Sequence, residues 1–163
     1  RALTGLGADL MTLHGSGGSA MLKAAAVAAA DEARRLSVIR PKLLAVTVLT
    51  SIDADEWKKL GHTNSISQSV LTMAGAAKAA GMDGTVSSPH EAAEIRRLNG
   101  PDFLIVTPGI RPSFAQSDDQ KRVTTPKEAV QNGATHLVIG RPITKAADPQ
   151  EAARAIAEEI REV

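Results

Sequence analysis

Ile105–Thr144 reads IVTPGIRPSFAQSDDQKRVTTPKEAVQNGATHLVIGRPIT, and this stretch carries the clearest structural signals in the chain. An apolar run, Phe103–Val106, predicts a strand that ends at the Thr-Pro-Gly that follows it. A second run, His136–Ile139, predicts another strand, and a helix between the two begins at Pro126 and ends at Gly133. Two buried parallel strands would therefore deliver polar groups to one shared edge, where α/β proteins bind ligands.

The residues that follow these two strands favour an anionic ligand. Gly140 has no Cβ, so its backbone is open to close approach, and Arg141 carries a planar guanidinium suited to phosphate oxygens. Arg111 and Gln120 lie in the polar loop before the helix. Lys121–Arg122 is more typical of a solvated basic loop, and the alternative role for Arg141 is an ion pair at a strand end. In a (β/α)8 barrel the loops after strands seven and eight frequently bind phosphate.

Strands and helices alternate along the rest of the chain. The other predicted strands are Asp9–Leu13, Lys42–Leu49 and Asp83–Val86. The predicted helices are one that ends at Gly7, Ser19–Arg35, Asp53–Leu60 with Trp57 as its packing residue, Ser65–Ala80, one that begins at Pro89 after a capping box of Ser88 and Glu91, and one that begins at Asp148-Pro149. Repeated βα units imply a parallel sheet, and strands that are apolar on both faces fit a sheet covered on both sides. The pattern leaves two layouts open, a doubly wound sheet and part of a (β/α)8 barrel.

Composition places the chain among soluble globular proteins. With 163 residues, 43% of them hydrophobic and 23% charged, residues 1–163 are expected to form a single domain. A net charge of +1 gives no reason to expect binding to nucleic acid or to a membrane surface. The chain has no cysteine, which excludes disulfides and thiolate metal sites. Neither a membrane-spanning run nor a signal peptide is visible, so we expect a cytoplasmic protein.

Five short motifs resemble those of orotidine 5′-phosphate decarboxylase, in its bacterial branch, in order and in spacing. They are Val48–Ser51, Ser88–Glu91, Pro108–Pro112, Asp119–Arg122 and Ile139–Thr144. Each motif is weak alone, but together they are highly specific and cover essentially the whole chain. The resemblance implies a (β/α)8 TIM barrel, to which this chain supplies about five βα units, those of strands 4 to 8. The chain also begins within what reads as a helix, which suggests that the polypeptide is longer.

The resemblance implies a site that binds a nucleotide, orotidine 5′-phosphate. By that resemblance Gln120 and Arg141 contact the phosphate, the backbone N–H of Gly140 faces it, and Arg111 belongs to the loop that closes over it. Thr50–Ser51 matches positions that contact the nucleotide, with the Ser hydroxyl near the pyrimidine edge. The alternative for this pair is a cap on the helix predicted to begin at Asp53.

The reaction implied by the resemblance removes CO2 from C6 of the pyrimidine and gives uridine 5′-phosphate, without a metal or an organic cofactor. The family's Asp-x-Lys-x-x-Asp run surrounds the leaving carboxylate, and its Lys protonates the carbanion. The nearest run here, Asp119–Thr124, fails at the last position, so we assign no catalytic residue to this chain. We expect the chain to need the missing barrel segment, to be inactive alone and, as the family implies, to form a homodimer.

Two alternatives remain open at this stage. The first is a related sugar-phosphate enzyme on the same barrel, such as hexulose-phosphate synthase or ketogulonate-phosphate decarboxylase. The second is a half-barrel without catalytic activity that serves as a binding or assembly module.

Overall fold

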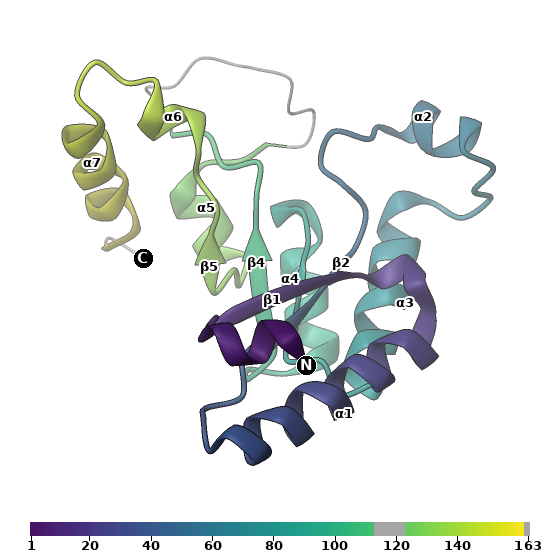
Figure 1. The fold of residues 1–163 in the computed structure, drawn as a ribbon. Helices are drawn as coiled ribbons and strands as arrows, with labels where there is room; N and C mark the ends of the chain where they lie inside the picture. The colour runs from purple at the N-terminus through teal and green to yellow at the C-terminus, as the bar shows by residue number, and fades with distance from the viewer. Residues whose placement is uncertain (113–122, 162–163) are drawn as a thin grey trace.

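A computed structural model describes residues 1–112 and 123–161 of the chain, and its centre is a five-stranded sheet. All four strand pairs are parallel and the strand order follows the sequence, as Figure 1 shows. The strands are β1 (Leu10–His14), β2 (Lys42–Val46), β3 (Gly84–Val86), β4 (Leu104–Thr107) and β5 (His136–Leu137). The predicted parallel α/β architecture is therefore confirmed.

Two strands end earlier than the sequence predicts, because the chain leaves the sheet at its carboxyl edge. β2 ends at Val46 instead of Leu49, and β5 ends at Leu137 instead of Ile139. One further backbone hydrogen bond to the neighbouring strand lies just beyond the end of each of these two strands. The N–H of Thr47 donates to the Val86 carbonyl (3.0 Å), and that of Val138 donates to the Thr107 carbonyl (2.9 Å). The residues beyond these bonds are thus available for loops.

Several helices begin where the sequence supplies a side-chain cap. Asp53, Ser65 and Thr125 each accept a hydrogen bond from a backbone N–H in the first turn of the helix that follows. The helices are α1 (Gly18–Leu36), α2 (Ala54–Lys59), α3 (Ile66–Ala79), α4 (Pro89–Asn99), α5 (Pro126–Gln131), α6 (Arg141–Thr144) and α7 (Pro149–Arg161), with 3-10 turns η1 (Ala2–Leu6) and η2 (Gly15–Gly17). The predicted helix end at Gly7 is confirmed by its left-handed φ of 73°.

Two helix starts differ from the predictions. Ser88 does cap α4, but its Oγ accepts from the N–H of His90 (3.4 Å), and the reciprocal capping box forms instead between Thr125 and Glu128. α6 was not predicted, because the apolar run before Gly140 reads only as a strand end. Proline suits the first turn of a helix, and the Gly140 carbonyl accepts from the N–H groups of Ile143 (2.9 Å) and Thr144 (3.0 Å).

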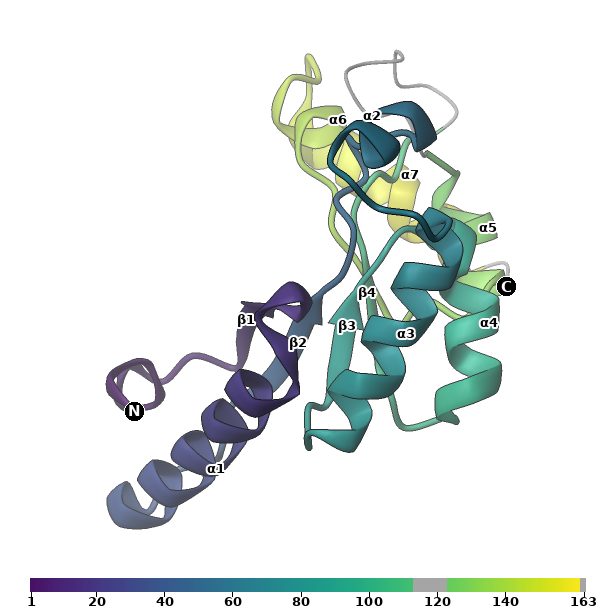
Figure 2. The ribbon, with the colours of Figure 1, turned by 90° about the vertical axis from the view of Figure 1, so that its right-hand side faces the viewer.

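One face of the sheet carries the helices. Helices α3 and α4 contact β2, β3 and β4, and α1 packs on β2 through Leu22 and Ala29 (Figure 2). The opposite face includes Leu10 and Val138, whose side chains are 41% and 51% exposed. On this same face Leu44 and Val106 are only 1% and 6% exposed, so its centre is buried and its ends are not. Of the predicted cover on both sides, the described residues provide helices on one face. No helix in this part of the chain is long and apolar enough to cross a membrane.

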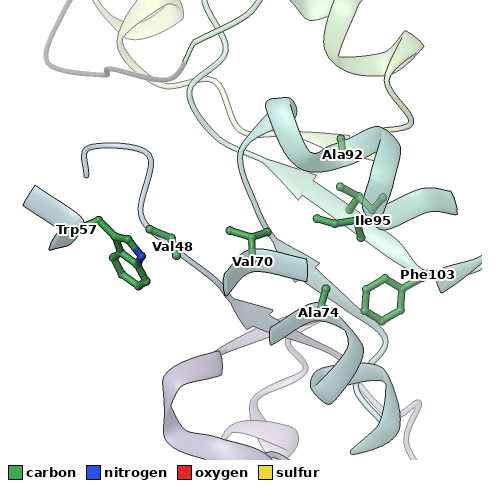
Figure 3. Packing of buried hydrophobic residues seen from close by; sticks show 8 residues of the cluster. Val48, Trp57, Val70, Ala74, Ala92, Ile95 and Phe103 are labelled. Carbon is green, nitrogen blue, oxygen red and sulfur yellow. The ribbon is translucent and has the colours of Figure 1, made fainter. Parts of the chain in front are cut away.

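The core is built mainly from small aliphatic side chains, with few aromatic ones. A first cluster joins α2, α3 and α4 to the sheet and comprises Val48, Trp57, Val70, Ala74, Ala92, Ile95, Phe103 and Ile105 (Figure 3). A second cluster lies under α1 and comprises Leu22, Ala29, Leu43, Ala45, Ala77, Ala80 and Met82. Backbones approach closely here. A Cβ added to Gly84 would lie 2.2 Å from the Leu104 carbonyl oxygen, so this strand position requires glycine.

The amino edge of the sheet is held by two charged side chains that bond to backbone groups. Asp83 accepts from Arg40 (2.6 Å) and from the backbone N–H of Leu43 (2.8 Å). Arg96 donates from Nη1 to the carbonyls of Gly100 and Pro101 (both 2.7 Å). Its Nη2 donates to the Gly133 carbonyl (3.0 Å), so one guanidinium joins the turn after α4 to the turn after α5.

We predict that Arg96→Ala lowers the free energy of unfolding by about 2 kcal/mol, because it leaves three carbonyls without their charged donor. Urea denaturation measures this change. Arg97→Ala is the matched control, since Arg97 lies on the same helix, is 66% exposed and pairs only with the exposed Glu94 among the described residues. Equal losses in the two variants would contradict the role assigned to Arg96.

Candidate functional site

The three loops that the sequence singles out follow β2, β4 and β5. Because all strands are parallel, these loops leave the same edge of the sheet, in the upper part of Figure 1. Thr50–Ser51 follows β2, Pro108–Arg111 follows β4, and Gly140–Arg141 follows β5. The latter two loops leave adjacent strands, whereas β3 separates Thr50–Ser51 from them. The expected convergence on one edge is therefore present.

Arg111 has a fixed backbone and an incompletely paired side chain. Its N–H donates to the Thr124 carbonyl (2.9 Å), and the N–H of Thr124 donates back to the Gly109 carbonyl (3.3 Å). Nη1 of Arg111 donates to the Ile110 carbonyl (3.0 Å). Nη2 is buried and has no hydrogen-bond partner within residues 1–112 and 123–161. A buried guanidinium nitrogen without an acceptor is unfavourable, and an anion is the ligand that suits it.

Thr124 and Thr125 hold the far end of this loop on the start of α5. Glu128 Oε2 accepts from Thr124 Oγ1 (2.6 Å), from the N–H of Thr125 (3.1 Å) and from Thr125 Oγ1 (2.9 Å). These bonds, first of all that from the Thr124 hydroxyl, hold the pKa of Glu128 below its ordinary value of 4.5. Glu128 thus anchors the strand-like bridge between Ile110 and Thr124 to a helix.

Gly140 and Arg141 form the start of α6. A Cβ added to Gly140 would meet nothing within 4 Å among the described atoms, so protein groups do not crowd its backbone. The predicted openness of Gly140 is consistent with this geometry. Arg141 is half-buried at the first position of the helix. Gln120, Lys121 and Arg122 lie outside the described residues, so their predicted positions stay predictions.

Thr50 and Ser51 are the central residues of a turn. The N–H of Ile52 donates to the Leu49 carbonyl (3.1 Å), Thr50 is buried and Ser51 is exposed. The alternative that this pair caps the following helix is wrong, because Asp53 Oδ1 accepts the N–H of Glu56 (2.8 Å) and is the cap. The turn residues therefore do not serve as that cap.

The sequence interpretation missed a set of buried hydroxyls at the carboxyl edge. Thr47 Oγ1 donates to the Val86 carbonyl (3.0 Å) and lies 3.2 Å from Ser87 Oγ, and Thr107 Oγ1 donates to the His136 carbonyl (3.3 Å). They join neighbouring strands at the base of the loops. A signal was present for two of them, because Ser87 and Thr107 directly follow apolar runs, whereas Thr47 lies inside the predicted strand Lys42–Leu49.

Other parts of the described chain offer weaker candidates for a site. A cavity of about 500 Å³ lies at the amino edge, between the turns before β3 and β4. Its Lys78 is bonded to the Asn99 carbonyl (2.7 Å), and its Asp83 holds the β2 backbone. No group of three or more potential metal ligands is found in the described residues.

Comparisons with known proteins agree with the sequence motifs. The sequence model of the orotidine 5′-phosphate decarboxylase / HUMPS family matches residues 1–156. The chain belongs to this family. Orotidine 5′-phosphate decarboxylase of Moorella thermoacetica is 50% identical over 161 residues, and that of Trichlorobacter lovleyi is 53% identical over 155 residues. These alignments cover 98% and 95% of this chain, and each spans 64% of the relative's length.

Solved structures of the decarboxylase family show the same arrangement. The enzyme from Lactobacillus acidophilus superposes with a TM-score of 0.80 at 39% identity, over 98% of this chain and 66% of that one. The enzyme from Pyrococcus horikoshii gives a TM-score of 0.66 at 25% identity, over 100% of this chain and 66% of that one. The chain thus aligns with about two thirds of each of these two structures.

We predict that Glu128→Gln reduces stability at neutral pH and that the difference from wild type disappears in acid. Because folding lowers the pKa of Glu128, its contribution is complete above 4.5 and is lost as the pH falls through the lower folded value. Urea midpoints measured from pH 7 down to about pH 3 test this. Glu158→Gln, which removes an exposed carboxylate from α7, is the control for net charge, and parallel pH profiles would contradict the prediction.

Proposed function

We propose that this chain is the phosphate- and nucleotide-binding part of an orotidine 5′-phosphate decarboxylase, which forms uridine 5′-phosphate and CO2 in pyrimidine synthesis. One observation carries the proposal. The Gly-Ile-Arg loop after β4 and the Gly-Arg-Pro helix start after β5 lie on adjacent strands. The former holds a buried guanidinium nitrogen that has no partner among the described residues. Membership of the family and relatives that bear this enzyme's name support it.

In this proposal the phosphate binds between the two loops. Arg141 and Gln120 contact its oxygens and Gly140 presents its backbone N–H. Nη2 of Arg111, which has no acceptor in the described part of the chain, directs a further donor to the anion. The arginines lie far from the reacting carbon of the base. Their binding energy can nevertheless drive loop closure and assembly of the site, because remote contacts contribute to transition-state stabilisation.

At the other end of the ligand, the turn at Thr50–Ser51 contacts the nucleotide. Its place at the carboxyl edge, two strands from the Arg111 loop, supports a ligand that spans the sheet edge from phosphate to base. The exposed hydroxyl of Ser51 is suited to a hydrogen bond with the pyrimidine. This assignment follows the sequence resemblance, and the geometry is compatible with it.

We further propose that the sheet is five of the eight βα units of a TIM barrel, within a single domain of a cytoplasmic homodimer. The exposure of Leu10 and Val138 on the face without helices supports this, because the interior of a closed barrel would cover those side chains. The 163 residues contain no Asp-x-Lys-x-x-Asp run. We therefore assign proton donation to residues outside this sequence, and no metal or organic cofactor takes part in the proposal.

We predict that Arg141→Ala weakens the binding of 6-azauridine 5′-phosphate by about 100-fold, as expected when a charged hydrogen-bonding partner of a phosphate is removed. Isothermal calorimetry on the protein in its full natural length measures the affinity. Lys145→Ala is the matched control, since Lys145 is an exposed cation at the other end of α6. A similar loss in both variants would mean that net charge alone attracts the ligand.

A second experiment separates the nucleotide enzyme from its sugar-phosphate relatives. We predict that the full-length protein binds 6-azauridine 5′-phosphate at least tenfold more tightly than a hexulose 6-phosphate, because only the nucleotide presents a pyrimidine to Thr50–Ser51. The isolated 163-residue chain should release no CO2 from orotidine 5′-phosphate. Preference for the sugar phosphate would overturn the proposed substrate, and decarboxylation by the isolated chain would overturn the assignment of the proton donor.

A further inference from the structure

Trp57 is the only tryptophan of the chain, and its ring is fixed by three contacts. The indole is only 6% exposed and lies beside Val48 in the first core cluster (Figure 3). Its Nε1–H donates to the Asn64 carbonyl (3.0 Å). The imidazole of His62 stacks on it, with ring centroids 3.5 Å apart and planes inclined by 8°. The position and the orientation of the indole are both defined.

These contacts close the loop that contains the proposed nucleotide-binding turn. Val48 leaves the sheet just before Thr50–Ser51, and Asp53 caps α2 just after it. Helix α2 then returns Trp57 to the side of Val48. The turn is therefore held between Val48 and α2, and the indole keeps these two close together. A shift of the indole would move α2 and, through Asp53, the turn.

We propose that Trp57 is a positioning residue for nucleotide binding, and that the stacked His62 holds it in place. This inference rests on the proposed function, because it concerns the Thr50–Ser51 end of the same ligand. It goes beyond that function by assigning a role to two residues that do not touch the ligand in the proposal. The sequence suggests only packing for Trp57 and no role for His62.

The exposure of His62 separates this role from simple core packing. Its side chain is exposed and belongs to no buried cluster of the described residues, yet its ring covers one face of the indole. Removal of the imidazole should therefore alter the orientation of Trp57 and leave the core filled. Phe103 offers the opposite case, because it is buried in the same cluster but precedes β4 at the amino edge.

The test uses the full-length protein and two probes, 6-azauridine 5′-phosphate and inorganic phosphate. His62→Ala should weaken nucleotide binding by about two- to tenfold, the range expected for one lost aromatic pair. The affinity for phosphate should stay unchanged. His62→Phe retains a stacking ring and should restore nucleotide affinity. Phe103→Leu should lower the urea midpoint and leave both affinities unchanged.

The outcomes distinguish this inference from the proposed function. Wild type that fails to bind 6-azauridine 5′-phosphate overturns both. Wild type that binds it, with His62→Ala binding equally well, overturns only the positioning role. The positioning role is also overturned if Phe103→Leu weakens nucleotide binding as much as His62→Ala does. It is likewise overturned if His62→Phe fails to restore the nucleotide affinity.

Discussion

The candidate site depends on the short parallel pairing between β4 and β5. Only Val106 with His136 and Thr107 with Leu137 are paired in register, yet side chains extend the contact. The hydroxyl of Thr135 accepts the N–H of Ile105 (2.9 Å) and donates to its carbonyl (3.1 Å). This pairing brings the loop of Arg111 beside the start of α6. Because parallel strands end at one edge, their polar loops share a small region of space.

The polar side chains at the two edges of the sheet have different roles. At the amino edge, Asp83 and Arg96 bond to backbone groups and join turns, so their charges are used within the protein. At the carboxyl edge, hydroxyls such as Thr47 and Thr107 join the strands, and Arg111 retains a nitrogen without a partner among the described residues. Stability and ligand binding are thus served by different side chains, which allows each to be tested separately.

Local signals explain why much of the fold could be predicted. Apolar runs bounded by Pro and Gly located all five strands, and Pro89 and Pro126 located the starts of two helices, because these effects act over a few residues. Errors arose where neighbouring groups compete for the same hydrogen-bond partners. The capping box formed at Thr125 because Glu128 reaches three donors there, while Ser88 took the N–H of His90. The start of α6 is held by hydrogen bonds to the Gly140 carbonyl, and the spacing of apolar residues does not predict such bonds.

The sequence by itself determined the order of βα units and the motifs that identify the family, since residue type and spacing carry this information. Only the tertiary structure decided which sheet face the helices cover, and that Ile110 lies opposite Thr124. It also showed that His62 stacks on Trp57. These features require segments that close on one another in space. Local preferences do not specify such closures, because packing and hydrogen bonding select them.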